Sequence, residues 1–216
     1  MRKEAVMEAL RETGVVAVIR TENPSDLVAV CRALGAGGVR FVEITMTVPG
    51  ALAIIQEATR QLRDDKTFIG VGTVLDAETA RAAILAGAHF VVGPCFDAGV
   101  VRVCQTYGVA VMPGALTPTE VVNAWKGGAD VVKIFPGDIG GPGYIKALKE
   151  PLPQVELLPT KGVDFETAGA FIKAGAIAVG TGTALVTKAL MAAKDYAGIS
   201  QNAARFVKLV QEAKGQ

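Results

Sequence analysis

Short apolar segments alternate with longer amphipathic segments along almost the whole chain. The apolar segments are rich in Val, Ile and Phe and are bounded by turn residues, a pattern typical of buried strands. We predict strands over Val15–Ile19, Arg40–Ile44, Thr67–Val71, Phe90–Val92, Ala110–Met112, Asp130–Ile134, Val155–Leu157 and Ala176–Val179.

The amphipathic segments predict helices that begin near a capping residue and end near glycine. A leading helix is expected over residues 1–13, and Asn23 or Ser25 is expected to cap a helix that runs to about Leu34. A final helix is expected over residues 200–214. The helices between these are expected to begin near Pro49, Asp76, Asp97, Thr117, Pro142 and Asp164.

Strands and helices alternate without an interdomain linker, which predicts a single α/β domain over residues 1–216. Eight such units fit a (β/α)8 TIM barrel with an N-terminal helix. The alternative is a doubly wound open sheet. The Gly-x-Gly-x-x-Gly turn that would favour it is missing after the first strand, so we predict the barrel.

Composition and charge limit the kinds of partner and cofactor that we expect this protein to bind. The formal net charge of +1 gives no indication of a nucleic-acid or membrane-surface partner. No apolar run reaches the ~18 residues of a membrane span, and no signal segment precedes the first helix. Three scattered cysteines (Cys31, Cys95 and Cys104) and a single histidine, His89, offer neither a disulfide framework nor a metal site. We therefore expect a cytoplasmic protein with no metal and no other cofactor.

Lys133 lies in the middle of the predicted strand Asp130–Ile134. Side chains alternate along a strand, so Val131, Lys133 and Phe135 share one face, while Val132 and Ile134 share the other. Both faces are otherwise apolar, as in a parallel strand covered on each side. An ammonium group is costly to bury there unless it has a partner or reaches water. The strand therefore predicts a functional lysine, whose amine could form a Schiff base with a carbonyl compound. The alternative is a lysine that reaches solvent along its stem.

Glu43 is a second ionisable residue within an apolar strand, Phe41-Val42-Glu43-Ile44-Thr45. Phe41, Glu43 and Thr45 share a face, which we place inside the barrel. One interpretation is a buried ion pair with Lys133 that holds the barrel together, although such pairs are weak stabilisers compared with apolar packing. The other is a general acid/base that moves protons during carbinolamine, imine and enamine steps.

Other candidate residues lie where the predicted strands end, the region that carries catalytic groups in this fold. Arg20 ends the first strand, and a guanidinium suits a carboxylate, although a surface arginine is a comparable alternative. Glycine-rich turns end the last two strands and could bind a phosphate through backbone N–H groups. The remaining candidates are Thr73, Pro94, Thr160, Lys161, Gly162, Gly182 and Thr183.

At this point the chain resembles the 2-keto-3-deoxy-6-phosphogluconate (KDPG) aldolases and their 4-hydroxy-2-oxoglutarate relatives over essentially its whole length. The resemblance is carried by Val42-Glu43-Ile44-Thr45, Gly70-Val71-Gly72-Thr73-Val74, Val132-Lys133-Ile134-Phe135-Pro136 and the two glycine-rich turns. It implies a metal-independent class I aldolase, typically a homotrimer, with Lys133 as the Schiff-base lysine and Glu43 as the acid/base. It also implies that Arg20, Thr73 and Pro94 surround the pyruvate portion, and that Gly162, Gly182 and Thr183 hold the distal phosphate.

Three positions depart from the family's pattern. Lys161 replaces the first glycine of a Pro-Thr-Gly-Gly turn, Thr183 replaces a serine, and Thr47 stands where some relatives have arginine. These changes concern the far end of the substrate. The favoured substrate is KDPG, and the alternatives are 4-hydroxy-2-oxoglutarate and the galactonate epimer of KDPG. Two rival functions are a phosphosugar isomerase or epimerase on the same barrel and a non-catalytic scaffold or sensor.

Overall fold

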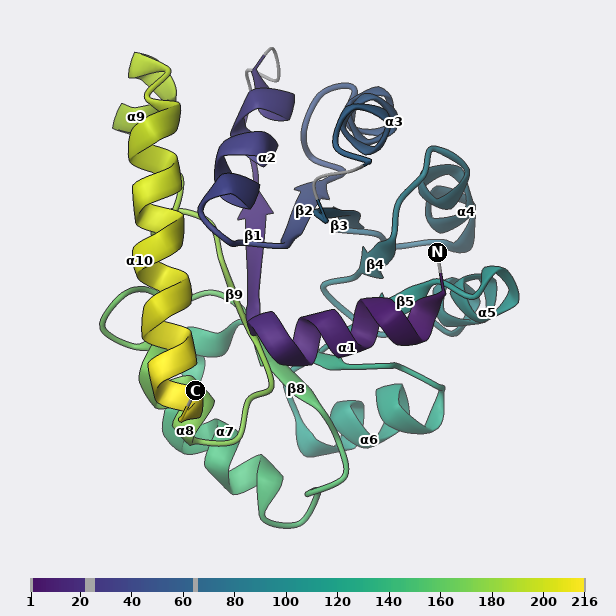
Figure 1. Ribbon diagram of the computed structural model, residues 1–216. Coiled ribbons are helices and arrows are strands. Elements are labelled where there is room, and N and C mark those ends of the chain that lie inside the picture. Colours follow the sequence, from purple (N-terminus) through teal and green to yellow (C-terminus); the bar gives the residue numbers. More distant parts are fainter. Residues whose placement is uncertain (1, 22–25, 64–65, 216) are drawn as a thin grey trace.

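The computed structural model describes residues 2–21, 26–63 and 66–215 and has an α/β fold with parallel strands (Figure 1). Six strands form one sheet in the order β5-β4-β3-β2-β1-β9, and three form a second sheet in the order β6-β7-β8. The strands are β1 (Val15–Ile19), β2 (Phe41–Thr45), β3 (Phe68–Gly72), β4 (Phe90–Val92), β5 (Ala110–Met112), β6 (Gly114–Ala115), β7 (Val132–Ile134), β8 (Leu157–Pro159) and β9 (Val179–Thr181).

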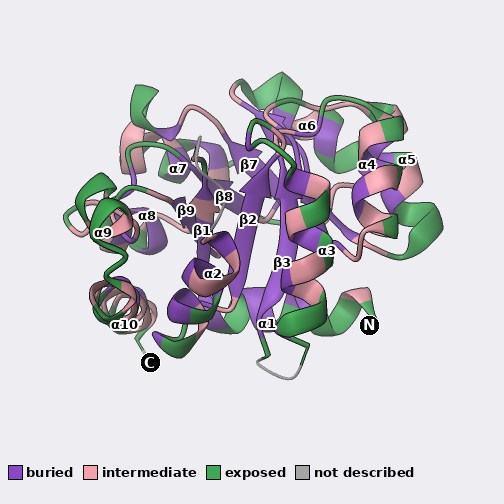
Figure 2. Ribbon diagram, turned by 90° about the horizontal axis from the view of Figure 1, so that it is seen from above, coloured by how far each residue is buried: buried purple, intermediate pink, exposed green. Residues whose placement is uncertain are grey.

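Hydrogen bonds connect the two sheets at both edges. Pro113 alone separates β5 from β6, and its carbonyl accepts a hydrogen bond of 2.9 Å from the Lys133 N–H. On the other side, Thr160 and Gly180 form a parallel bridge between the end of β8 and β9. Viewed from above, the buried strands lie at the centre and helices surround them (Figure 2).

The strands separate two apolar layers, as their alternation predicts. Val42 and Ile44 face outward and pack under the surrounding helices. Phe41 faces inward and belongs to a second cluster with Phe68 and Phe90. The Phe41 ring stacks on Phe68 at a centroid distance of 4.8 Å and lies 5.5 Å from Phe90. Each of these rings is the first residue of its strand, so together they fill the amino-terminal end of the interior.

Helix α1 (Lys3–Thr13) covers that end of the interior (Figure 1). Its stripe of Val6, Met7 and Leu10 joins the inner cluster of phenylalanines. Gly14 ends the helix in a left-handed conformation, with φ 69°, and turns the chain directly into β1. The leading helix expected over residues 1–13 is thus confirmed for the described part, and it closes one end of the strand assembly.

The other helices follow from local signals. The side chains of Asp76, Asp97 and Thr117 accept hydrogen bonds from backbone N–H groups and cap their helices as expected. The expected caps Asn23 and Ser25 lie outside the described residues. The remaining helices are α2 (Leu27–Ala36), α3 (Ala51–Gln61), α4 (Ala77–Leu85), α5 (Ala98–Tyr107), α6 (Pro118–Lys126), α7 (Gly141–Lys149), α8 (Ala168–Lys173), α9 (Lys188–Ala193) and α10 (Tyr196–Lys214), with a 3-10 turn, η1 (Gly137–Ile139).

Some boundaries differ from the predicted ones. Strand β8 begins two residues later than the expected Val155, because the Val155 N–H closes a turn onto Leu152 and is not part of the strand ladder. Strand β9 extends through Gly180 and Thr181, which pair with β1 although they are not apolar. Within the described residues, no helix is long and apolar enough to cross a membrane.

Candidate active site

Lys133 and Glu43 face each other inside the strand assembly, at the level just beyond the phenylalanine layer. Lys133 Nζ lies 3.9 Å from Glu43 Oε1, and the two side chains are only 7% and 2% exposed. Lys133 Nζ also lies 5.2 Å from the centroid of the Phe135 ring. The inward orientation expected for both charged residues is therefore confirmed.

The contact between these charges is loose. A separation of 3.9 Å is too long for a hydrogen bond. Among the described residues, Oε1 of Glu43 has no hydrogen-bond partner, and neither does the buried hydroxyl of Thr160. Buried polar atoms are ordinarily satisfied, and exceptions often mark reactive sites. Glu43 Oε1 therefore faces the Lys133 amine with its hydrogen-bonding capacity unused.

Gly72 makes room for the Glu43 carboxylate. It lies on the neighbouring strand, paired with Thr45, and a Cβ at this position would overlap Oε1 of Glu43. Thr45 is fully buried, and its hydroxyl shares a hydrogen bond of 2.8 Å with Thr47. Glu43 therefore bends over a glycine instead of packing against a side chain, which leaves its oxygen free toward Lys133.

Arg20 and Thr73 directly follow β1 and β3, and Pro94 follows β4 after Gly93, at the same end as the Lys133–Glu43 pair. Arg20 is exposed, while Thr73 and Pro94 are half-buried. Thr73 has a left-handed φ of 59°, which ends its strand abruptly. Pro94 lies against Gly114, which pairs in turn with Lys133. The structure thus places these residues around the mouth above the lysine.

The glycine-rich turns after β8 and β9 lie side by side. Their strands meet at the bridge between Thr160 and Gly180, where a Cβ on the glycine would press on the threonine hydroxyl at 2.5 Å. Gly162 and Gly182 follow two residues later on each strand, next to the exposed Lys161 and Thr183. The geometry therefore gathers all the residues that the sequence singled out at one end of the strands.

Comparison with known proteins identifies this arrangement. Residues 6–202 match the family model described as KDPG and KHG aldolase. The chain is 32% identical over 206 residues to the 2-dehydro-3-deoxy-phosphogluconate aldolase of Treponema pallidum, covering 95% of this chain and 97% of the relative. It is 35% identical over 200 residues to the 2-dehydro-3-deoxy-6-phosphogalactonate aldolase of Escherichia coli, covering 92% and 95%. The solved "Native KDPGal structure" is similar with a TM-score of 0.86 and 33% identity, covering 94% of this chain and 96% of the other.

The chain belongs to the KDPG and KHG aldolase family. It is an aldolase and hence a lyase. The family assignment leaves the isomerase, scaffold and sensor alternatives without support.

The surroundings of the two buried cysteines and of His89 argue against a catalytic role for these residues in the aldolase. Burial raises the pKa of the Cys31 and Cys104 thiols to about 12, so both stay protonated and unreactive. Desolvation lowers the pKa of His89, whose Nδ1 accepts a hydrogen bond of 3.1 Å from the Ile69 N–H. His89 directly precedes β4, at the amino-terminal end of the strands. Across the described ranges, no three His, Cys, Asp or Glu residues cluster to hold a metal ion.

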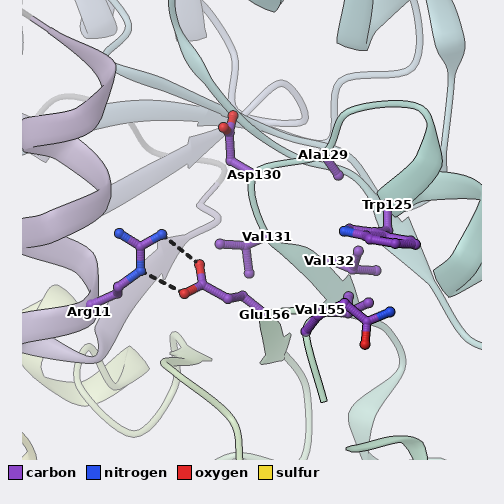
Figure 3. A pocket seen from close by; sticks show the side chains of 9 residues that line it. Arg11, Trp125, Ala129, Asp130, Val131, Val132, Val155 and Glu156 are labelled. Carbon is purple, nitrogen blue, oxygen red and sulfur yellow. Dashed lines mark hydrogen bonds and ion pairs between the residues drawn. The ribbon is translucent and has the colours of Figure 1, made fainter. Parts of the chain in front are cut away.

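Cavities lie at both ends of the strands. One of about 240 Å³ opens beside the aldolase mouth and is lined by Pro94, Gly114 and Phe135 together with residues of the β6–α6 region. Another of about 290 Å³ lies at the opposite end, between α1 and the starts of β7 and β8 (Figure 3). Arg11 and Glu156 line this second cavity, and the Arg11 guanidinium donates two hydrogen bonds to the Glu156 carboxylate. Lys133 lies nearer the first cavity, because Gly114 lines that cavity and pairs with Lys133 directly.

The structure adds two features that sequence patterns did not reveal. Gly72 was part of a recognised motif, but its role as the space for Glu43 depends on cross-strand register. Asp138, which pairs with Lys161, lies on η1 immediately after β7 and was not singled out. The signal available for it was an acidic residue four positions after the end of the strand that carries Lys133.

Proposed function

We propose that this aldolase cleaves KDPG to pyruvate and glyceraldehyde 3-phosphate through a Schiff base on Lys133. The observation that carries the proposal is the buried, loosely paired Lys133 and Glu43 in a chain of this family. A pair held only for stability would be expected to make short hydrogen bonds that repay desolvation. The separation of 3.9 Å instead leaves room for substrate atoms to come between the two groups.

The reaction begins when the neutral Lys133 amine attacks the C2 ketone to give a carbinolamine, which loses water to form a protonated imine. The imine withdraws electrons as the C3–C4 bond breaks. Glu43, acting through a water molecule, takes the proton of the C4 hydroxyl, and the aldehyde departs. The remaining enamine takes a proton at C3, and water then hydrolyses the pyruvate imine to release pyruvate and free the lysine.

Residues around the mouth hold the two ends of the substrate in this proposal. Arg20 and Thr73 bind the pyruvate carboxylate, with Pro94 packed against the three-carbon unit. The distal phosphate lies over the two glycine-rich turns, where backbone N–H groups are accessible. The residues proposed for the phosphate are Thr160, Lys161, Gly162, Gly182 and Thr183.

The 2-keto-3-deoxy-6-phosphogalactonate epimer is the second candidate substrate. It is favoured by the 35% identity to an aldolase named for that compound. The two compounds differ in configuration at C4, next to the bond that breaks. We infer that the hydrogen-bonding position of Glu43 relative to this hydroxyl decides between them, and kcat/KM measured for both epimers with one preparation gives the answer.

We further infer a closed eight-stranded barrel, with β5 and β6 counted as one strand interrupted at Pro113. The hydrogen bonds at both sheet edges support closure. The resemblance supports a homotrimer, and the exposed Leu75 and Ile139 offer apolar surface near the mouth for subunit contact. Free Cys31, Cys95 and Cys104 fit a reducing, cytoplasmic setting. Light scattering of the purified protein tests the trimer.

Trapping of the imine tests the chemistry directly. Protein incubated with pyruvate and borohydride should gain a 1-carboxyethyl group, formed by reduction of the imine, and peptide mass spectrometry should locate it on Lys133. Reduction without pyruvate is the control for non-specific labelling. An adduct on a different lysine, or none in protein that cleaves KDPG, would contradict the proposed mechanism.

A further inference from the structure

Asp138 and Lys161 form an ion pair at the end of neighbouring strands β7 and β8. Lys161 Nζ lies 3.6 Å from Asp138 Oδ2, and the side chains are 59% and 44% exposed. The pair lies beside Thr160 and Gly162, which belong to the proposed phosphate site. An acidic residue at this place is unexpected, because it repels the anion that the site would bind.

The backbone fixes Asp138 against the glycine-rich turn. The Gly137 N–H donates a hydrogen bond of 2.8 Å to the Thr160 carbonyl, which joins the two loops. A Cβ on Gly162 would lie 2.6 Å from the Cβ of Asp138, so the turn is in close contact with the acidic residue. The Cα and Cβ of Asp138 therefore lie against the glycine-rich turn, which keeps the carboxylate close to the proposed phosphate site.

Lys161 occupies a backbone conformation that favours glycine. Its φ is 74°, in the left-handed region where a side chain costs free energy relative to glycine. A strained residue at a binding site points to a role for its side chain. The contact of 3.6 Å between the ammonium group and the Asp138 carboxylate indicates what that role is.

We propose that Asp138 and Lys161 act as a charge-compensated pair that sets the affinity of the mouth for the substrate's phosphate. Lys161 cancels the repulsion between Asp138 and the phosphate, and Asp138 in turn prevents Lys161 from holding the phosphorylated product too tightly. Asp138 thereby becomes a specificity-determining residue that disfavours a phosphate unless Lys161 compensates its charge. This inference rests on the proposed function, since it assigns the far end of the same site.

If the pair acts in this way, Lys161→Gly and Asp138→Asn should change kcat/KM for KDPG in opposite directions. Lys161→Gly leaves Asp138 uncompensated and should lower kcat/KM for KDPG by roughly three- to tenfold, the size expected of one charge acting on a phosphate across several ångströms of water. Asp138→Asn frees Lys161 and should raise kcat/KM by a similar factor through a lower KM. The double variant has no net charge at the pair and should return close to the parent value. All three shifts should shrink as salt rises.

Lys194→Gly is the matched control. Lys194 is also left-handed, with φ 51°, and pairs with Asp26 at 2.9 Å, but it is outside the proposed site. It should leave kcat/KM unchanged, and an equal loss in Lys194→Gly would mean that backbone relief and not charge explains the Lys161 result. Unphosphorylated 2-keto-3-deoxygluconate should react equally with all variants. An unchanged KM in Asp138→Asn, or a double variant whose kcat/KM stays at the Lys161→Gly value, would overturn the proposal.

Calorimetric titration with inorganic phosphate separates this inference from the proposed function, because it needs no turnover. If pyruvate is not trapped on Lys133, the Schiff-base mechanism fails. The pair is still supported if phosphate affinity rises in Asp138→Asn and falls in Lys161→Gly. If pyruvate is trapped but phosphate affinity is the same in all variants, the pair is refuted and the mechanism stands.

Discussion

The two ends of the strand assembly handle charge in opposite ways. At the amino-terminal end, Arg11 donates to Glu156 at 2.6 and 3.0 Å and Lys3 pairs with Asp130 at 2.8 Å. These groups are partly exposed and fully paired. At the carboxyl end, Lys133 and Glu43 are almost fully buried and lie 3.9 Å apart. The ion pairs that connect α1 to the strands are short and partly exposed, whereas the two charges proposed for catalysis are buried and lie farther apart.

Removing the reactive amine should have the largest effect. Lys133→Met is expected to reduce cleavage of KDPG below detection, because methionine fills a similar volume but cannot form an imine. Steady-state assay of pyruvate release measures the loss, and circular dichroism should still report a folded protein. Residual cleavage near the parent rate would show that another residue carries the covalent step.

Glu43→Gln should rank second. It keeps the volume and hydrogen-bonding capacity but removes the proton carrier, so kcat should fall by about 10²–10⁴-fold. Borohydride should still trap pyruvate on Lys133. Near-normal turnover would mean that Glu43 serves only as the ionic partner of the lysine.

Gly72→Ala tests whether space for the carboxylate matters. The added methyl group should push Oε1 of Glu43 aside and lower kcat by up to roughly 10²-fold, because small misplacements of catalytic groups are costly. Gly70→Ala on the same strand is the matched control, since its methyl group would meet the Phe90 ring instead. We expect thermal denaturation to shift mainly in Gly70→Ala and turnover to fall mainly in Gly72→Ala. The reverse pattern would refute the role of Gly72.

Arg11→Met tests the role of the ion pair at the amino-terminal end of the strands. Arg11 is 51% exposed and its hydrogen bond to Glu156 raises its own pKa further. Loss of the pair should lower the free energy of unfolding by about 0–1 kcal/mol, as for other surface pairs. Chemical denaturation measures this, while kcat/KM should stay at the parent value. A large fall in activity would mean that the two ends are coupled.

The smallest effect expected is a pH dependence through His89. Its pKa is lowered by desolvation, so the unfolded state binds a proton more readily than the folded one. This contribution to stability is complete above the unfolded pKa near 6.5 and declines as pH falls below it. His89→Gln should weaken the change in unfolding free energy between pH 7 and about 5, measured by denaturant titration at each pH. An unchanged pH profile would contradict it.

The sequence was informative where one residue type conflicts with its surroundings. Lys133 and Glu43 stood out because alternation placed a charge on the inner face of an apolar strand, and both are buried there. Helices with a capping side chain, such as α4 after Asp76, were located to the residue. These signals are local, so one chain is enough to read them.

Features that depend on contacts between distant segments were missed. Helix α9 has no buried residue among those in its range, so hydrophobic periodicity could not indicate it. The space that Gly72 provides follows from the register of β2 and β3, which no local pattern encodes. Pairing of Asp138 with Lys161 similarly depends on two loops that meet only in the folded chain.

The cover that α1 forms over the phenylalanine layer has a consequence for the order of events in each catalytic cycle. Leu10 and the rings of Phe41, Phe68 and Phe90 block the amino-terminal side, so traffic to Lys133 passes through the mouth. In the mechanism proposed above, the three-carbon fragment is bound to Lys133 and the aldehyde lies above it, toward the mouth. The aldehyde must therefore leave first, and in the direction of synthesis pyruvate must enter first. By covering the amino-terminal end of the strands, α1 thus favours an ordered kinetic pattern in the proposed mechanism.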